Sequence, residues 1–501
     1  MDTLRVFAVN FLEITTLVMA FLIVLTIVAV VYMYIVDVTQ TEQTIRRNYP
    51  VIGRFRYFFE HLGEFFRQYF FALDREELPF NRAQRSWVYR AAKNLDSTVA
   101  FGSTHPLNEP GDIIFLNGLF PPLEEEVRPR GKIVYGKGFA RQPYSTTSFF
   151  NISAMSFGAL SAPAIEALSS GAREAGIWLN TGEGALSPYH LEGGCDIVFQ
   201  IGTAKYGVRD EQGMLSDKKL LALAELEEVR MFEIKLSQGA KPGKGGILPG
   251  AKVTDLIART RGIPEGEDSL SPNRHPDIST IDDLLEMIHR VREVTGKPVG
   301  IKAVIGQSAW LDELCQQVWE RGLEYAPDFF TVDSADGGTG AAPQSLIDYM
   351  GLPLRRSLPL VVDKLIENGL RDRIRVICSG KMINPSGVAS ALCLGADSVN
   401  SARGFMFALG CIQALQCNKN TCPTGITTHD PDLQKGLHPA DKARRVASYA
   451  RNLLHEVEVI AHSCGVADSS LLNRSHAQII SEDGIPESLE ILFPDVKSRP
   501  N

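Results

Sequence analysis

Between residues 149 and 401 the chain repeats one pattern eight times: a short apolar run, a turn rich in glycine or polar residues, and a longer stretch with helical spacing. This order is typical of successive strand–helix units in a parallel sheet. The predicted strands are Phe149–Ala154, Ile177–Thr181, Asp196–Ile201, Met231–Leu236, Val299–Val304, Phe329–Val332, Arg375–Cys378 and Ser398–Ser401. Eight units favour an α/β fold with a closed (β/α)8 barrel of the TIM type, and an open doubly wound sheet is the alternative.

Polar residues that follow the predicted strands are expected at one end of the barrel, because parallel strands in a closed barrel end at the same rim. Barrel enzymes place their chemistry at that rim. Between the fourth and fifth strands lies an insertion of about sixty residues, which is too long for a simple loop. It includes GAKPGKGGILPG and RGIPEGEDSLSPNRHPD. We expect this insertion to cover the active site.

The amino-terminal part contains 23 residues without a charge, Ile14–Val36. As a helix this run would be roughly 34 Å long, against a bilayer core of about 30 Å, and it predicts one transmembrane helix. A cleaved signal peptide fits poorly because the run is too long and no small-residue cleavage pattern follows, whereas a core helix stays open. Only Arg5 precedes the run, and four basic residues follow it closely: Arg46, Arg47, Arg54 and Arg56. This asymmetry predicts a single-pass membrane protein with its catalytic domain in the cytoplasm.

The segment from Pro50 to Leu73 alternates aromatic residues with Arg, Glu and His. This pattern suits a helix on the membrane surface, and equally an amphipathic helix packed on the catalytic body. We divide the chain into a membrane segment (1–40), a connecting region (41–148), the barrel with its cysteine segment (149–430) and a carboxyl-terminal extension (431–501). A net charge of −8 and a sequence pI near 5.8 argue against a nucleic-acid partner.

Three of the eight cysteines, Cys411, Cys417 and Cys422, lie within twelve residues. Their gaps of six and five positions cannot place all three thiols on one helical face, so the segment predicts a loop wrapped around a bound group, and thiolates of this kind suit iron. Three buried cysteines without metal are the alternative. In a cytoplasmic domain the cysteines are expected to be reduced or metal-bound.

Two glycine-containing turns follow the last two predicted strands. They are VICSGKM and VNSARGF, which offer backbone amides together with Lys381 and Arg403. Barrels commonly bind phosphate at these two loops, so the candidates for a cofactor phosphate are Gly380, Lys381, Ala402, Arg403 and Gly404. Ordinary glycine-rich turns, or a phosphorylated substrate in place of a cofactor, are the alternatives.

The sequence DSADGGTGAAP follows the sixth predicted strand. Gly337 and Gly338 would let the backbone approach a planar ring, and Asp336 could accept hydrogen bonds from cofactor hydroxyls. Lys302 lies within the fifth strand, where a lysine is unusual unless an anionic group lies near it. It could stabilise a reduced flavin or pair with a core carboxylate.

Taken together, five motifs resemble the FMN-binding synthase domain of glutamate synthases, in the same order along the chain. They are AMSFGALS (154–161), NTGEG (180–184), IKLSQGAKPGKGG (234–246), DGGTGA (336–341) and GCIQALQCNKNTCPTGITTHDP (410–431). The similarity is strongest from Phe149 to Pro431. The full chain, with its amino-terminal apolar segment and the QRSWVYRAAK region, is similar to the shorter FMN-binding glutamate synthase family proteins.

The resemblance implies a barrel that holds FMN, with Met155 and Ser156 among its contacts, and a 3Fe–4S cluster on Cys411, Cys417 and Cys422. It implies reductive amination of 2-oxoglutarate, or a similar 2-oxo acid, with electrons from the cluster and flavin. The family's substrate-binding residues match Gln238, Lys241 and Arg261, and its catalytic groups match Glu183 and Lys241. Glu183 could instead cap the following helix. Lys244 stands where the family commonly carries Glu.

Two absences shape the expected partners. The chain has no cysteine before Cys195, so it has no amino-terminal cysteine nucleophile for releasing ammonia from glutamine, and it has no G-x-G-x-x-G fingerprint after a strand. We expect a partner protein or free ammonia to supply nitrogen, and ferredoxin or a separate NAD(P)H reductase to supply electrons. A membrane-bound electron-transfer component without amination activity is the alternative function.

Overall fold

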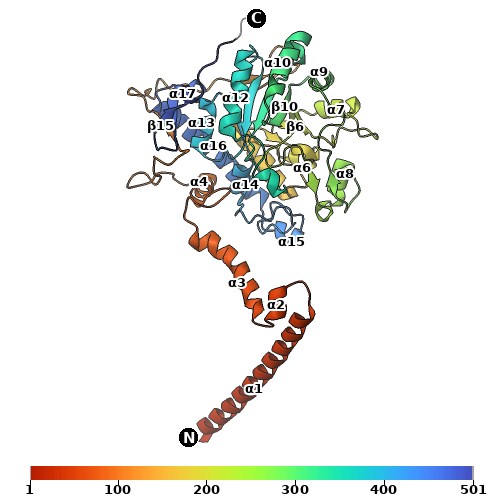
Figure 1. Cartoon of the computed structure of the whole chain (residues 1–501), viewed down its shortest axis with the longest axis vertical. Coiled ribbons are helices and arrows are strands. Elements are labelled where there is room, and N and C mark those ends of the chain that lie inside the picture. Colours follow the sequence, from red (N-terminus) through yellow and green to blue (C-terminus); the bar gives the residue numbers. More distant parts are fainter. Residues whose placement is uncertain (1, 499–501) are drawn as a thin grey trace. The chain divides into compact units, whose positions relative to one another are not determined.

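The computed structural model describes residues 2–498 and divides into two compact units, Met1–Ala83 and Gln84–Asn501. We call them the amino-terminal unit and the barrel unit. The division into four segments expected from the sequence stays a prediction. In the amino-terminal unit the helices are α1 (Asp2–Thr39), α2 (Thr44–Asn48) and α3 (Gly53–Phe66), and α3 continues into one π-helical turn, η1 (Arg67–Phe71). Figure 1 draws α1 as one straight helix that ends shortly before α2.

Eight parallel strands form a closed barrel in the second unit (Figure 1). In barrel order they are β4 (Phe150–Ile152), β5 (Leu179–Asn180), β6 (Ile197–Ile201), β7 (Val229–Lys235), β10 (Val299–Val304), β11 (Phe329–Asp333), β12 (Arg375–Ser379) and β13 (Ser398–Ser401). Each of the eight predicted strands overlaps one of these. The TIM-type barrel is therefore confirmed, and the open doubly wound sheet is wrong because β13 pairs with β4 and closes the sheet.

Helices that follow the strands surround the barrel. They are α5 (Ala162–Ala175), α6 (Pro188–Glu192), α7 (Asp217–Ala224), α9 (Ile281–Thr295), α10 (Ala309–Arg321), α12 (Leu354–Glu367), α13 (Pro385–Cys393) and α14 (Arg403–Leu409). Local signals set their ends: the Thr280 hydroxyl accepts the Asp283 amide in a capping box at the start of α9, and Gly296 ends the helix at φ 70°. The long helix α16 (Pro439–Ser463) packs against α5.

The remaining elements are short and lie outside the barrel strands. The predicted insertion contains the paired strands β8 (Ile247–Leu248) and β9 (Ser269–Leu270), η3 (Gly250–Lys252) and α8 (Asp255–Arg261). The others are α4 (Arg82–Ala92), β1 (Ile113–Phe115), β2 (Ile133–Tyr135), β3 (Tyr144–Thr146), η2 (Gly182–Gly184), η4 (Leu323–Tyr325), α11 (Gln344–Ile347), α15 (Pro431–Gln434), η5 (Ser469–Leu471), η6 (Arg474–His476), β14 (Ala477–Ile480), β15 (Pro486–Ser488) and α17 (Leu489–Leu492).

A polar cluster lies among the barrel strands. The Glu233 carboxylate, 1% exposed, accepts hydrogen bonds from Asn180 Nδ2 at 2.9 Å, Gln200 Nε2 at 2.7 Å and Thr331 Oγ1 at 2.6 Å. These four residues come from four different strands. Because a buried carboxylate without partners is costly, the three donors hold strands β5, β6, β7 and β11 in one register.

A buried ion-pair cluster lies at the end of the barrel where the parallel strands begin. Asp328, just before β11, accepts hydrogen bonds from Arg292 Nε at 2.9 Å, Arg373 Nη1 at 2.9 Å and the Val299 amide at 2.8 Å. The side chains of Asp328 and Arg292 are 0% and 2% exposed. The cluster joins α9 to the starts of β10 and β11 and to the segment before β12.

Candidate active site

The mouth of the barrel, where the parallel strands end, brings the predicted site residues together. Met155 and Ser156 follow β4, Glu183 follows β5, and Gln238 and Lys241 follow β7. Further round the barrel, Lys302 lies within β10, while Asp336, Gly337 and Gly338 follow β11, Gly380 and Lys381 follow β12, and Ala402, Arg403 and Gly404 follow β13. These predicted site residues therefore meet at one rim, because the strands are parallel and the barrel is closed.

One side of the mouth carries the residues predicted for the cofactor. Lys302 Nζ is 3.5 Å from Asp333 Oδ2, which also accepts the Gly239 amide at 2.9 Å. The pairing of Lys302 with a buried carboxylate, expected as an alternative, is therefore present. Lys381 Nζ is 3.3 Å from Asp336 Oδ2. Two basic residues on this side of the mouth are thus held by aspartates at the end of β11 and in the loop after it.

Arg403 is a third basic residue on the same side, and it is half-buried. Its Nη2 donates to the Asp336 carbonyl at 3.4 Å. Burial lowers the pKa of the Arg403 guanidinium to about 10, and the charges of Asp336 and Asp333 oppose this effect. A desolvated guanidinium is well suited to an anionic ligand because a phosphate restores the interactions that water would provide.

Glycines at the mouth allow its loops to approach closely. A Cβ on Gly380, where φ is +134°, would lie 2.2 Å from Ser334 Cβ, and one on Gly338 would lie 2.8 Å from Arg403 Cζ. A Cβ on Gly182 would lie 2.8 Å from the Ser156 amide nitrogen. These glycines are required by contacts between neighbouring loops, which pack the loop after β4 onto the loop after β5 and the loop after β11 onto those after β12 and β13.

Glu183 lies at the centre of a group of cations on the other side of the mouth. Its Oε1 is 3.1 Å from Lys235 Nζ, and Lys241 and Arg261 are close enough for their charges to act on it. Burial alone would raise the pKa of Glu183, but Lys235, Lys241 and Arg261 outweigh it and lower the pKa overall. Glu183 is therefore a half-buried ion-pair partner, and the following helix α6 is capped by Ser187 instead.

Two lysines of this group differ in their surroundings. Lys235, the last residue of β7, also donates to Gln238 Oε1. Burial lowers the pKa of Lys241, while Glu183 opposes the shift and Lys235 adds to it. Sequence reasoning missed Lys235, although a lysine inside a buried strand was the same signal that identified Lys302. Lys244 is exposed, so the charge reversal expected at this position adds no buried cation.

Arg261 is the last residue of α8 and is 5% exposed. Its Nη2 donates to the Phe157 carbonyl at 3.0 Å and its Nη1 to Ser269 Oγ at 3.1 Å, while its guanidinium lies over the Tyr206 ring, 5.4 Å from the centroid. The Nε of Arg261 is buried without a hydrogen-bond partner. Arg261 thus attaches the insertion to the loop after β4 and keeps one donor unused.

The segment from Cys411 to Cys422, which we call the cysteine loop, borders the mouth. A Cβ on Gly340, in the loop after β11, would lie 3.9 Å from Cys417 Cβ. Lys252 of the insertion donates to the Cys417 carbonyl at 3.3 Å and to the Ala159 carbonyl at 3.0 Å. The cysteine loop therefore contacts both the loop predicted to hold a cofactor and the insertion.

The cysteine loop is irregular between Cys411 and Cys422, as predicted. Gln413, Leu415 and Asn420 have positive φ of 56° to 60°. Helix α4 supports its start, because Tyr89 Oη donates to the Cys411 carbonyl at 2.6 Å. Backbone turns of this kind curve the loop back on itself. Among the described residues, no helix or strand lies between Cys411 and Cys422.

The three thiols of the cysteine loop affect one another. Burial raises the pKa of Cys411 to about 12, with further contributions from Cys417 and Cys422. The Gln413 amide donates to Cys411 Sγ at 3.4 Å, and Cys422 Sγ lies 3.3 Å from Thr424 Oγ1. Among residues 2–498, no three His, Cys, Asp or Glu side chains are grouped as ligands of a single metal ion. An iron–sulfur cluster is larger than one ion, and its thiolates are held farther apart.

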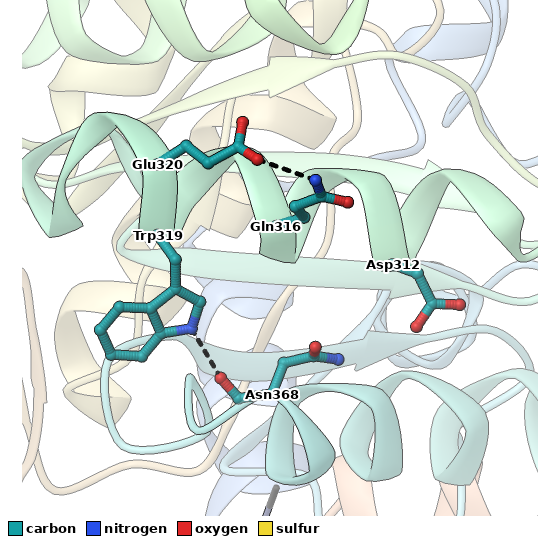
Figure 2. Close-up of a pocket in the computed structure, with 5 residues that line it drawn as sticks. All are labelled: Asp312, Gln316, Trp319, Glu320 and Asn368. Carbon is teal, nitrogen blue, oxygen red and sulfur yellow. Dashed lines mark hydrogen bonds between the residues drawn. The ribbon is translucent and has the colours of Figure 1, made fainter. Parts of the chain in front are cut away.

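A separate hollow lies on the outer side of the barrel. Asp312, Gln316, Trp319 and Glu320 of α10 line it together with Asn368 (Figure 2). Figure 2 shows the Trp319 indole N–H donating to the Asn368 carbonyl, at 2.8 Å, and Gln316 donating to Glu320, also at 2.8 Å. None of the predicted site residues lines this hollow, so the candidate active site is the barrel mouth.

Known proteins resemble this chain in sequence and in fold. The conserved region in glutamate synthase matches residues 129–467. The glutamate synthase large subunit-like protein YerD of Bacillus subtilis (strain 168) is 38% identical over 501 residues, covering 92% of this chain and 95% of that protein. The archaeal-type glutamate synthase (NADPH) of Thermotoga sp. (strain RQ2) is 33% identical over 394 residues, covering 78% and 74%.

Solved structures are similar to this chain at low identity. A flavocytochrome b2 mutant with benzoylformate has a TM-score of 0.47 at 16% identity, covering 84% of this chain and 86% of that one. The assignment of this chain to a family rests on the sequence matches, because they extend over most of the chain and include all five motifs. The chain belongs to the glutamate synthase family.

Proposed function

We propose that the barrel mouth is the active site of a glutamate synthase-like oxidoreductase that reductively aminates 2-oxoglutarate or a related 2-oxo acid. The observation that carries this proposal is the buried group of Lys235, Lys241 and Arg261 around Glu183. A dicarboxylate needs cationic partners in a site that excludes water. The unused Nε of Arg261 and the Lys241 ammonium are suitable donors.

Glu183 is the candidate for proton transfer or for binding ammonium. Its carboxylate is held ionised by three cations and pairs directly with Lys235. A substrate carboxylate that binds Lys241 and Arg261 would compete with Glu183 for them and place the 2-oxo carbon beside it. General acid–base groups act when they lie within hydrogen-bond reach of the reacting atoms. Glu183 would then hold the nitrogen donor while Lys241 and Gln238 orient the oxo acid.

FMN and a 3Fe–4S cluster are the proposed cofactors. When bound, FMN supplies hydride transfer and the cluster supplies one-electron transfer. The residues of the mouth fit FMN, because the buried Lys302 and the half-buried Arg403 suit an anionic ring edge and a phosphate. The proposed FMN contacts are Met155, Ser156, Lys302, Asp336, Gly337, Gly338, Gly380, Lys381, Ala402, Arg403 and Gly404.

The cysteine loop fits a cluster through the chemistry of its donors. Three thiols come from one irregular loop, and the Gln413 amide already donates to Cys411 Sγ. Amide donors to sulfur are among the features that tune iron–sulfur clusters. Cys417 lies close to the loop after β11, which supports electron transfer between a cluster here and a flavin at the mouth.

Electrons and nitrogen are proposed to come from partners. Relatives are named as NADPH glutamate synthases, whereas this sequence has no G-x-G-x-x-G fingerprint after a strand. Ferredoxin or a separate NAD(P)H reductase would reduce the protein, and free ammonia or an ammonia-releasing protein would supply nitrogen. Helix α1 is proposed as a single membrane span that leaves the barrel unit in the cytoplasm, since among the described residues it alone is long and apolar enough.

The function is tested with the purified full chain, reduced under anaerobic conditions. We expect 2-oxoglutarate with ammonium to reoxidise the bound flavin and to yield glutamate, followed by the flavin spectrum and by amino-acid analysis. A screen of other 2-oxo acids defines the substrate. If no 2-oxo acid reoxidises the flavin while a redox protein does so readily, the chain is an electron-transfer component and the amination proposal is wrong.

Replacing Arg261 by alanine should raise the KM for 2-oxoglutarate about 10- to 100-fold, because a hydrogen bond to a charged group contributes about 1.5–3 kcal/mol. The FMN content should not change, since Arg261 contacts the substrate side of the mouth. Steady-state kinetics measure the effect. Arg259→Ala is the matched control: Arg259 lies on the same helix, its side chain is 71% exposed, and it pairs with the exposed Asp255. An unchanged KM in Arg261→Ala rejects the assigned role.

A further inference from the structure

Helix α3 and the turn η1 present one continuous aromatic face to solvent. Its members recur at spacings of three, four, seven and eleven residues, which places them on one side of a helix. The aromatic face consists of Phe55, Phe58, Phe59, Leu62 and Phe66 of α3, together with Phe70 and Phe71 of η1, whose rings pack against Phe66. Phe58, Phe59 and Phe70 are 58%, 61% and 74% exposed. An apolar face this large and this exposed marks an interaction surface.

The rings of the aromatic face contact one another and remain exposed to solvent within the described part of the amino-terminal unit. Phe58 and Phe59 have centroids 5.4 Å apart, and those of Phe66 and Phe70 are 5.3 Å apart. Glu60 lies on the side of the helix away from the rings, and Arg56 lies between Glu60 and the rings; both are exposed. The helix is therefore amphipathic, with a basic and acidic side facing away from its rings.

A buried carboxylate fixes where this helix begins. Asp37 is 0% exposed, and its Oδ1 accepts Arg46 Nε at 2.9 Å. Its Oδ2 accepts Arg54 Nε and the Val51 amide, each at 2.9 Å. Asp37 thus joins the end of α1 to α2 and to the second residue of α3. The start of α3 is held beside the last turn of α1.

Glycine makes this junction compact. The Gly53 amide donates to the Tyr49 carbonyl at 2.7 Å, and a Cβ on Gly53 would lie 2.8 Å from the Ile45 carbonyl oxygen. A larger residue would force α3 away from α2. Glycine at 53 and the charges around Asp37 together set the position at which α3 leaves α1.

We propose that the aromatic face of α3 and η1 lies in the interface of the same lipid bilayer that α1 crosses. The uncharged run of α1 ends at Val36, so Asp37 is the first charged residue after the apolar run and belongs at the membrane–water boundary. Because Asp37 also holds Arg54, α3 starts at that boundary. The phenylalanine rings are then at the depth where amphipathic helices bury them.

The surrounding charges agree with an anionic bilayer surface. Arg47 and Arg56 are exposed next to the junction, and basic side chains near a leaflet are attracted to anionic headgroups. Asp37 pairs with both Arg46 and Arg54, so this group keeps one net positive charge at the junction. The barrel unit is thereby attached through two elements, a span and an in-plane helix, and not through a span followed by a free linker.

The experiment places a fluorescent ring on the aromatic face of the full chain. All four native tryptophans lie in the barrel unit: Trp87, Trp178, Trp310 and Trp319. Phe58→Trp is reconstituted into vesicles of phosphatidylcholine and phosphatidylglycerol, with and without bromine near the headgroup end of the acyl chains. We expect the emission added by Phe58→Trp to fall roughly twofold or more with brominated lipid, because the ring would lie about 5–10 Å inside the interface.

Matched variants make the result decisive. Glu60→Trp, on the opposite side of α3, should add emission that bromine does not quench, while Phe55→Trp should behave like Phe58→Trp. Emission of Phe58→Trp and Phe55→Trp that is unquenched would overturn the proposal, whether it is blue-shifted, as for rings packed on the barrel unit, or red-shifted, as for rings in water. Failure of the full chain to float with the vesicles would also overturn it. None of these readouts depends on amination activity, so the proposed function stands or falls separately.

Discussion

Replacing Cys417 by serine is expected to remove iron from the purified protein while leaving FMN bound. Cys417 supplies one of three thiols in the cysteine loop and lies against the loop after β11, with its Cβ 3.9 Å from the position of a Cβ on Gly340. Changing an outer-shell partner of a metal ligand alone costs about 10- to 100-fold in affinity, and losing a ligand costs at least as much. Anaerobic iron and sulfide analysis should therefore show at least a 10-fold loss.

The flavin gives the internal control in the same sample. The residues proposed to hold FMN lie within β10 and after β4, β11, β12 and β13, and they do not include the cysteine loop. The flavin content of Cys417→Ser should therefore match that of the unmodified chain. Cys464→Ser tests whether any thiol change has the same effect, since Cys464 is buried at the end of α16, outside the cysteine loop. Equal iron in Cys417→Ser and the unmodified chain would contradict the cluster assignment.

Replacing Asp328 by alanine should destabilise the barrel unit by about 3–5 kcal/mol, the cost of breaking a buried ion pair. The change leaves Arg292 and Arg373 buried with 2% and 7% of their side chains exposed and without their shared carboxylate. It also removes the acceptor of the Val299 amide at the start of β10. Thermal unfolding of the full chain, followed by circular dichroism, should show a lower midpoint.

Exposed ion pairs provide the comparison for this variant. Asp432 pairs with Lys435 at 3.1 Å, with 87% and 74% of their side chains exposed. Asp432→Ala should change stability by less than about 1 kcal/mol, because solvent screens exposed pairs. Asp328→Asn keeps the shape and should fall between the two variants. A midpoint for Asp328→Ala that equals that of Asp432→Ala would show that the cluster does not stabilise the barrel.

The regular parts of the fold follow from local patterns. Apolar runs of strand length, separated by helical stretches, predicted all eight barrel strands, because each pattern is set by neighbours close in sequence. The end of each strand then predicted which residues meet at the mouth. For Lys302 the sequence left open either a reduced flavin or a core carboxylate as the partner, and only the structure places Asp333 Oδ2 3.5 Å from its ammonium.

Contacts between distant segments could not be predicted. Tyr89 donates to the Cys411 carbonyl across 322 positions of the chain, and neither residue carries a local signal for the other. Lys235 and Glu183 form the 3.1 Å ion pair at the mouth only because β7 and the loop after β5 converge there. Whether a buried lysine meets a ligand or a carboxylate depends on side-chain directions that periodicity does not contain.

By itself, the sequence determined the number and order of the strand–helix units, the apolar helix at the amino terminus and the single loop that carries three close cysteines. Periodicity, length and spacing depend on residues that are close together in the sequence, so they are present before the chain folds. Tertiary structure alone decided that Asp37 joins α1 to α3, that Asp328 gathers two arginines, and that Arg261 keeps one buried donor unused. Each of these depends on groups far apart in the chain reaching hydrogen-bond distance, which the closed barrel and the helix junction bring about.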